Sequence, residues 1–332
     1  MLSGVHPICR RIFDTQKLVA EFPPRFTNSN KQVVHRIACP PDSTHSGQVV
    51  FSRWAKMSLP HAPDPDGART KFESRQDFFA YEPSPEGSAT VEWYLNFSHS
   101  DLFCAYGGRL FAQDEMQVAE HPALGSLREA LLPSDIHPLT VENGQPTPAL
   151  IKGVERRCRV ATDRNAEQGR PNGLYGNNFA AASAEAIAKA TQAIVPPTIS
   201  NVLAMEAPTG GRGRYGLQDI EYILGTAFTG FAAARFESWQ DTVQPAACGR
   251  SHRFLGVRCL RRQQGSDGLA ATPRCPVGRF GRSCFPHGRR SWFSGIPSGQ
   301  SDLAASRGVR RATTRRVERR SSDRIDGVFV GR

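Results

Sequence analysis

Residues 93–124 read WYLNFSHSDLFCAYGGRLFAQDEMQVAEHPAL, and this order of residue types decides the fold that we expect. An apolar, strand-like run is followed by a turn of small residues, and the adjacent acids Asp114 and Glu115 then open an amphipathic helix. Carboxylates at a helix start lie in the positive end of the helix dipole, and glycines such as Gly107 and Gly108 let a ligand approach the backbone. The same spacing also fits an ordinary strand, turn and capped helix.

The segment resembles the poly(ADP-ribose) glycohydrolases, whose signature is a strand ending in D-F-A-N, a glycine-rich diphosphate loop, Q-E-E and N-P-E-L. Without gaps, Asn96-Phe97-Ser98 falls on D-F-A, Gln113-Asp114-Glu115 on Q-E-E, and His121-Pro122-Ala123-Leu124 on N-P-E-L. A second block, residues 201–231, is similar to the family's I-V-A-I-D-A strand, its loop and the helix ending in A-Y-C-G-F. Together the blocks span roughly residues 85–236.

The chain departs from the family in the diphosphate loop. The family's G-G-G falls on Phe103-Cys104-Ala105, the glycines are displaced to Gly107 and Gly108, and the family's Asn after D-F-A falls on His99. The resemblance therefore implies a divergent subfamily in which Gly107 and Gly108 would face the diphosphate.

The resemblance implies a macrodomain-like three-layer α/β/α sandwich that hydrolyses ribose–ribose O-glycosidic bonds of poly(ADP-ribose), or a related ADP-ribosyl linkage. Glu115 would protonate the leaving oxygen and then deprotonate water, and Asp114 would hold ribose hydroxyls. Further candidate ligand-binding residues are Gly107, Gly108, Gln113, Asn96, His99, and the aromatic platforms Tyr175 and Tyr215. The partner would be the polymer or an ADP-ribosylated protein; we expect no cofactor and no metal, and a monomer.

The pattern of elements leads to the same fold class. It predicts a strand over 85–104, a helix over 113–132, an Ala-rich helix over 177–194 ended by Pro196-Pro197, a strand over 201–207 and a helix over 217–236. Strands that alternate with helices indicate a layered α/β sheet. We expect residues 1–84 to form an N-terminal helical or irregular layer, residues 85–240 the core, and residues 241–332 a disordered tail.

The tail carries all of the excess positive charge. From Pro245 onward there are 19 Arg, no Lys and 5 acids, whereas the whole chain has a net charge of +11, which leaves residues 1–244 at −3. A basic tail could bind nucleic acid, but a tail selected to hold phosphates normally uses both Lys and Arg. We therefore do not expect nucleic acid as a main partner.

A shifted reading frame would explain the composition of the tail. Leu255 to Gln263, LGVRCLRRQ, can be encoded so that moving one nucleotide forward reads W-G-C-G-A-F-G-G-N. This product resembles the family's second phosphate-binding loop, T-G-x-W-G-C-G-A-F-G-G, which follows the A-Y-C-G-F helix. Our hypothesis is a frameshift between about Ser238 and His252, which would leave the sandwich truncated.

Two other functions remain open. Residues 211–216, GRGRYG, match the G-x-G-x-x-G fingerprint of dinucleotide-binding folds, but no following strand carries the expected ribose-binding acid. The chain could also be a non-catalytic ADP-ribose-binding module with a basic tail. No secretion signal or membrane span is evident, so we expect a cytoplasmic protein.

Overall fold

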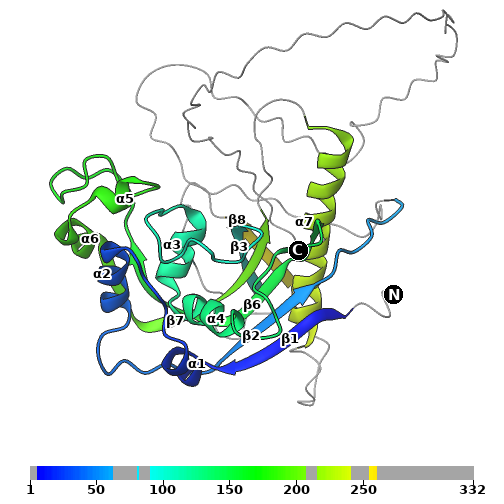
Figure 1. Cartoon of the computed structure of the whole chain (residues 1–332), viewed down its shortest axis with the longest axis horizontal. Helices are drawn as coiled ribbons and strands as arrows, with labels where there is room; N and C mark the ends of the chain where they lie inside the picture. Colours follow the sequence, from blue (N-terminus) through cyan, green and yellow to red (C-terminus); the bar gives the residue numbers. More distant parts are fainter. Residues whose placement is uncertain (1–5, 63–80, 82–89, 207–214, 241–253, 260–332) are drawn as a thin grey trace, which may run out of the picture. The chain divides into compact units, whose positions relative to one another are not determined.

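The computed structural model describes residues 6–62, 81, 90–206, 215–240 and 254–259, all within one compact unit. Their centre is a six-stranded mixed sheet with the strand order β1-β2-β6-β7-β3-β8 (Figure 1). Those strands are β1 (Pro7–Asp14), β2 (Gln48–Trp54), β3 (Thr90–Ser98), β6 (Ala149–Val160), β7 (Thr191–Glu206) and β8 (Phe254–Cys259). Strands β4 (Val141–Glu142) and β5 (Gln145–Pro146) pair only with each other.

The direction of the strands changes across the sheet. Neighbours from β1 to β7 are antiparallel, whereas β3 runs parallel to both β7 and β8. Ser98 pairs with Glu206, so the carboxyl ends of β3 and β7 lie at the same edge. In open α/β sheets ligands bind outside the carboxyl ends of parallel strands.

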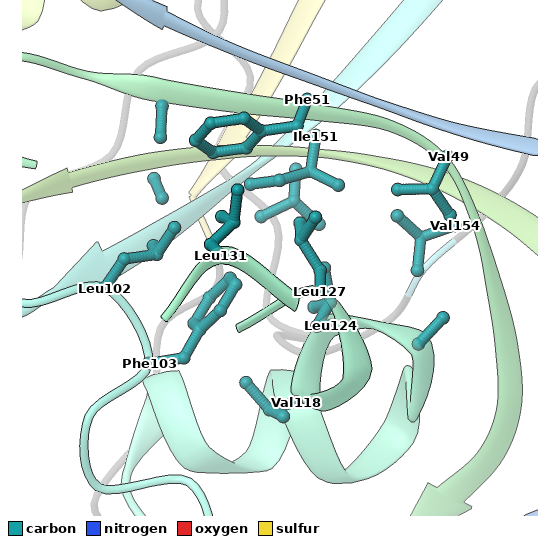
Figure 2. Packing of buried hydrophobic residues seen from close by; sticks show 14 of the residues in the cluster. Val49, Phe51, Leu102, Phe103, Val118, Leu124, Leu127, Leu131, Ile151 and Val154 are labelled. Carbon is teal, nitrogen blue, oxygen red and sulfur yellow. The ribbon is translucent and has the colours of Figure 1, made fainter. Parts of the chain in front are cut away.

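One face of the sheet is covered by α1 (Thr15–Glu21), α3 (Gln113–Glu120) and α4 (Ala123–Leu131). Side chains alternate between the two faces of a strand, and Phe51 and Ile151 of neighbouring strands point to this layer. There they pack with Leu124, Leu127 and other buried residues of the helices (Figure 2).

The other face is covered by α7 (Leu217–Gln240). Leu150, next to Ile151 in β6, points to this side and packs with Leu203, Trp93 and the helix residue Ala233. Two helical layers thus enclose the sheet, and the expected three-layer α/β/α architecture is confirmed.

A separate group of helices lies beyond one end of the sheet. These are α2 (Ser29–Ala38), α5 (Asn178–Ala181) and α6 (Ala184–Ala190), with Val34, Phe179 and Ile187 in their shared core. The aromatic rings of Phe111 and Phe179 stack with centroids 3.9 Å apart. Phe111 lies two residues before the start of α3, so this cluster packs against the start of that helix.

Two predicted helices were wrong in extent. The helix over 113–132 is two helices, because the chain leaves the helical conformation at His121 (φ −125°, ψ 75°) before Pro122. The helix over 177–194 is α5 and α6, and β7 begins at Thr191. Pro196-Pro197 therefore do not end a helix, because they lie within β7. The pairing of β7 with β6 skips from Ala193 to Thr198, so the strand needs no backbone N–H from the two prolines for this pairing.

The two ends of the chain also differ from expectation. The segment expected as an N-terminal helical or irregular layer supplies two strands, β1 and β2, to the sheet itself. Val49, Phe51 and Trp54 are buried there, which explains why this short run is a strand. In the tail, residues 254–259 form β8, and the rest of 241–332 lies outside the described residues. None of the described helices is long and apolar enough to span a bilayer.

Candidate active site

The two acids lie in the first turn of α3, as the sequence predicts. Asp114 is 7% exposed and Glu115 is 3% exposed. An oxygen of Glu115, Oε2, accepts a hydrogen bond from the backbone N–H of Ala112 at 2.9 Å, as in a capping box. Asn96, which is fully buried near the end of β3, donates from Nδ2 to Oδ1 of Asp114 at 3.1 Å. The structure therefore brings Asn96 and the acid pair together.

Gln113 fastens the start of α3 to β3. Its Nε2 donates to the carbonyl of Leu95 at 2.7 Å, and its Oε1 accepts from the N–H of Phe97 at 2.9 Å. Among the described residues, the pairing of β3 with β8 extends to Leu95, and the side-chain amide of Gln113 hydrogen-bonds the backbone of β3 at Leu95 and Phe97. Gln113 therefore has a structural role: its two hydrogen bonds hold the start of α3, with Asp114 and Glu115, at a fixed distance from the end of β3.

The turn that carries the glycines is held by the segment before α2. The carbonyl of Gly107 accepts from the backbone N–H groups of Thr27 (3.0 Å) and Asn28 (3.1 Å). A Cβ on Gly107 would overlap the carbonyl of Arg25, so only glycine allows this close approach. The N–H of Gly108 donates to the carbonyl of Ala105 at 2.9 Å and closes a turn.

Phe103, shortly before the glycines, has an unusual backbone conformation. It is fully buried and has a φ of +58°, a left-handed conformation that side-chain-bearing residues rarely adopt. In the gap-free alignment Phe103 occupies the first position of the family's G-G-G.

The remaining predicted site residues lie in different settings. His99 is exposed, and its Nδ1 accepts from the N–H of Asp101 at 3.1 Å, so it orders the bend after β3. Tyr175 is half-buried against the cluster that contains Phe111 and Phe179. Tyr215 is 40% exposed just before α7, and most of the GRGRYG loop lies outside the described residues.

Sequence reasoning missed Lys31, the most buried lysine at this site. Its side chain is 1% exposed, and Nζ donates to the carbonyl of Tyr106 at 2.7 Å. Burial lowers the pKa of Lys31 to about 8, although the charges of Glu115 and Asp114 oppose that shift. A single lysine in an amphipathic helix normally points to solvent, so no local signal marks it.

A buried polar network continues along α3 away from the acid pair. Arg156 of β6 contacts Glu120 through Nε and Nη2, both at 2.9 Å, and Glu120 also accepts from the N–H of Val160. His121 bridges the carbonyl of Gln117 and the hydroxyl of Ser200. Burial and the nearby charge of Arg156 lower the pKa of His121 to about 3, which keeps the ring neutral.

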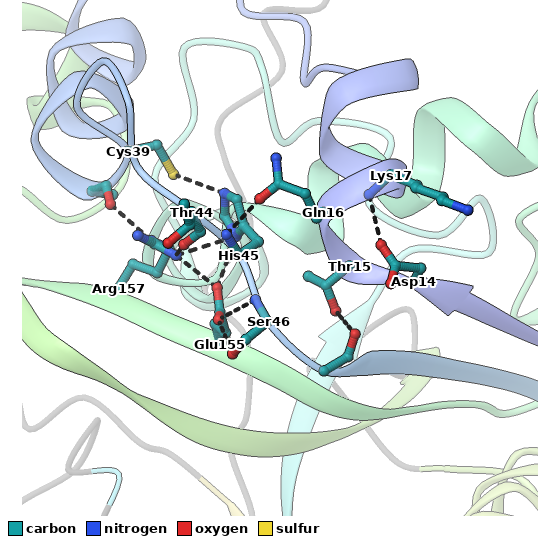
Figure 3. Close-up of polar contacts among 12 residues, drawn as sticks. Asp14, Thr15, Gln16, Lys17, Cys39, Thr44, His45, Ser46, Glu155 and Arg157 are labelled. Atoms are coloured by element: carbon teal, nitrogen blue, oxygen red, sulfur yellow. Dashed lines mark hydrogen bonds and ion pairs between the residues drawn. The ribbon is translucent and has the colours of Figure 1, made fainter.

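A second network fastens the loop after α2 to β6 (Figure 3). Glu155 contacts Nδ1 of His45 and Nη1 of Arg157, both at 2.7 Å, and accepts from the N–H of Ser46. Burial alone would raise the pKa of Glu155, but these hydrogen bonds outweigh it and lower the pKa to about 2. Sγ of Cys39 lies 3.9 Å from Nε2 of His45, and burial raises the pKa of that thiol to about 11.

Within the described ranges, no group of three or more His, Cys, Asp or Glu side chains could hold a metal ion. The chain matches none of the protein-family models, and a search of curated proteins returns no match either. The residues around Asp114 and Glu115 are therefore the basis for inferring a function.

Proposed function

We propose that this chain hydrolyses ribose–ribose O-glycosidic bonds of poly(ADP-ribose), or a related ADP-ribosyl linkage. The observation that carries the proposal is the buried pair Asp114–Glu115 in the first turn of α3, next to the carboxyl end of β3. Burial, followed by the charges of Asp101, Asp114 and Glu115, raises the pKa of the Cys104 thiol, which lies shortly before the glycines.

Hydrolysis of a glycosidic bond requires a group that first donates a proton and then accepts one. Cleavage of a glycosidic bond passes through an oxocarbenium-like state, in which the leaving oxygen gains a proton and the attacking water loses one. Glu115 would supply the first proton and accept the second. Asp114 would bind ribose hydroxyls, with its orientation held by Asn96.

Two features of Asn96 and Glu115 bear on how a substrate would bind. Oδ1 of Asn96 is buried and finds no donor among the described residues, so it would accept a hydrogen bond from a ribose hydroxyl. Because Glu115 is only 3% exposed, a sugar reaches it only when neighbouring side chains move apart.

The test uses the full chain, ADP-ribose polymer and the substitution Glu115→Gln. Gln can still accept from the N–H of Ala112, so the fold should be kept, while release of ADP-ribose should fall by about 10²–10⁴-fold. Glu185→Gln is the matched control, because Glu185 lies in the first turn of α6 but is exposed. An unchanged rate in Glu115→Gln would remove Glu115 from the mechanism.

The second candidate is a non-catalytic ADP-ribose-binding module. The observation that favours it is the hydrogen bond between Glu115 and Ala112, which uses the carboxylate as a helix cap. Calorimetry with ADP-ribose, run beside the turnover assay, separates the two functions. Binding with no release from the polymer selects the module.

A further inference from the structure

Lys31 occupies a position that disfavours a positive charge in two ways. Asn28 is the N-cap of α2 and accepts from the backbone N–H groups of Asn30 and Lys31, so Lys31 lies in the first helical turn. A cation there opposes the helix dipole. The side chain is also 1% exposed, and burying an ammonium without compensating partners is unfavourable because the ion loses its hydration.

The contacts of Lys31 lead to the glycine turn. Nζ donates to the carbonyl of Tyr106, the residue before Gly107, at 2.7 Å. The aromatic rings of Phe111 and Phe179 lie 5.1 and 5.9 Å from Nζ, within the range of a cation–π interaction. Phe111 lies just before the cap of α3. The ammonium therefore lies between the glycine turn and the helix that carries the acids.

The charges that act on Lys31 come from α3. Glu115 and Asp114 favour its protonated form, against the larger effect of burial. Other charged groups on elements packed against α2 are exposed or engaged elsewhere. Glu185 and Lys189 of α6, Arg36 and Arg159 are exposed. In β6, Glu155 pairs with both His45 and Arg157, and Arg156 pairs with Glu120. Glu206 of β7 accepts a hydrogen bond from Tyr222. His35 is half-buried, and burial lowers its pKa.

We propose that Lys31 is a positioning residue of the Asp114–Glu115 site. Its ammonium holds the glycine turn through the carbonyl of Tyr106 and offsets the negative charge of the two carboxylates. The kinetic part of this inference rests on the proposed glycohydrolase function, whereas the coupling of the three charges does not.

A neutral Lys31 would neither hold the glycine turn as an ammonium nor offset the charge of the carboxylates. This loss predicts the direction in which the rate changes with pH. Since the pKa of Lys31 is about 8, the ammonium is present at neutral pH and disappears as the pH rises through about 8. The rate of ADP-ribose release should therefore fall on the alkaline side with an apparent pKa near 8. Substitution to Met keeps the apolar stem and removes the charge, so the fold should survive.

The kinetic experiment compares the full chain with Lys31→Met and Lys31→Arg between pH 6 and 10. Lys31→Met should lower the rate of ADP-ribose release by about 100-fold, which is the effect of displacing a catalytic group by about 1 Å. It should also abolish the fall in rate on the alkaline side of the pH profile. Lys31→Arg should be faster than Lys31→Met, and its rate should not fall at pH 9 because arginine stays protonated there. Lys189→Met, on the exposed face of α6, should change nothing. A rate and a pH profile of Lys31→Met equal to those of the unaltered chain would overturn the positioning role.

A second measurement is independent of turnover. The Lys31 Cε resonance, assigned by its absence from Lys31→Met, is titrated by NMR in the unaltered chain, Glu115→Gln and Asp114→Asn. Each substitution removes a negative charge, so the Lys31 midpoint should move to lower pH. Equal midpoints in all three proteins would overturn the inference, whether or not the chain is a hydrolase. A shifted midpoint in a chain that releases no ADP-ribose would instead reject the proposed function and retain the charge coupling.

Discussion

Asn96 and Asp114 are joined by a hydrogen bond of 3.1 Å although one lies in β3 and the other in α3. Both side chains are buried, so the bond cannot exchange readily with water. Together with the amide of Gln113 on the backbone of β3, it fixes the orientation of the helix start relative to the strand end. The geometry of the acid pair is thus set by a strand that is otherwise part of the sheet.

The first prediction concerns this bond. Asn96→Leu should lower the free energy of unfolding by about 1–3 kcal/mol, because buried Asp114 loses a donor. Asn96→Asp should lower the free energy of unfolding further at neutral pH, where two carboxylates face each other. Part of this loss should be recovered in acid, where one of the carboxylates is protonated. Urea unfolding at pH 7 and pH 5 measures both, with exposed Asn172→Leu as the control. If the unaltered chain and Asn96→Leu have the same free energy of unfolding, the Asn96–Asp114 hydrogen bond contributes nothing to stability.

The second prediction separates the two glycines. Gly107→Ala should cost about 1–3 kcal/mol, since its Cβ meets the carbonyl of Arg25 and the backbone has to shift. Gly108→Ala should cost less, because its Cβ would lie 3.3 Å from the carbonyl of Ala105, a tight contact that a small shift relieves. Chemical denaturation of the two variants gives the comparison. A Gly108→Ala loss larger than that of Gly107→Ala would contradict the packing argument.

The third prediction uses the pKa of Glu155. Its folded pKa of about 2 lies below the ordinary glutamate value of 4.5, so its ionised form stabilises the fold above about pH 4.5. That contribution is lost as the pH falls from about 4.5 towards 2. Glu155→Gln should therefore be less stable than the unaltered chain at neutral pH, and the difference should shrink over this interval. Stability measured by denaturant at successive pH values gives the curve, and a pH-independent difference would contradict the assignment.

The fourth prediction concerns the reading frame of the tail. If the frame shifts between about Ser238 and His252, DNA of a close relative should continue after the α7 region with a W-G-C-G-A-F-G-G loop. Sequencing the locus across codons 235–260, and the same region of a relative, decides it. A relative whose DNA keeps the present frame through Arg332 would reject the hypothesis.

Several parts of the structure could be predicted from short stretches of sequence. The apolar run of β3, the second half of β7, and α7 were all expected, and so was the layered α/β class that they imply; the three-layer arrangement was expected from the resemblance. The acids at the start of α3 were also expected there, because a cap and a first turn are specified within four residues. The helix break at His121-Pro122 and the strand identity of Thr191–Ile194 were missed, since Ala-rich and apolar runs fit either element until their partners are known.

The sequence by itself determined the local features: which runs alternate, where α3 begins, and that two carboxylates stand side by side at its first turn. These depend on residues within one or two turns of each other. Tertiary structure alone decided that β1 and β2 complete the sheet, that the amide of Gln113 bonds the backbone of β3, and that Lys31 lies against Tyr106. Those arrangements join residues far apart in the chain, such as Lys31 with Tyr106 and Phe51 with Ile151, and their energy comes from burial and charge contacts that no local pattern contains.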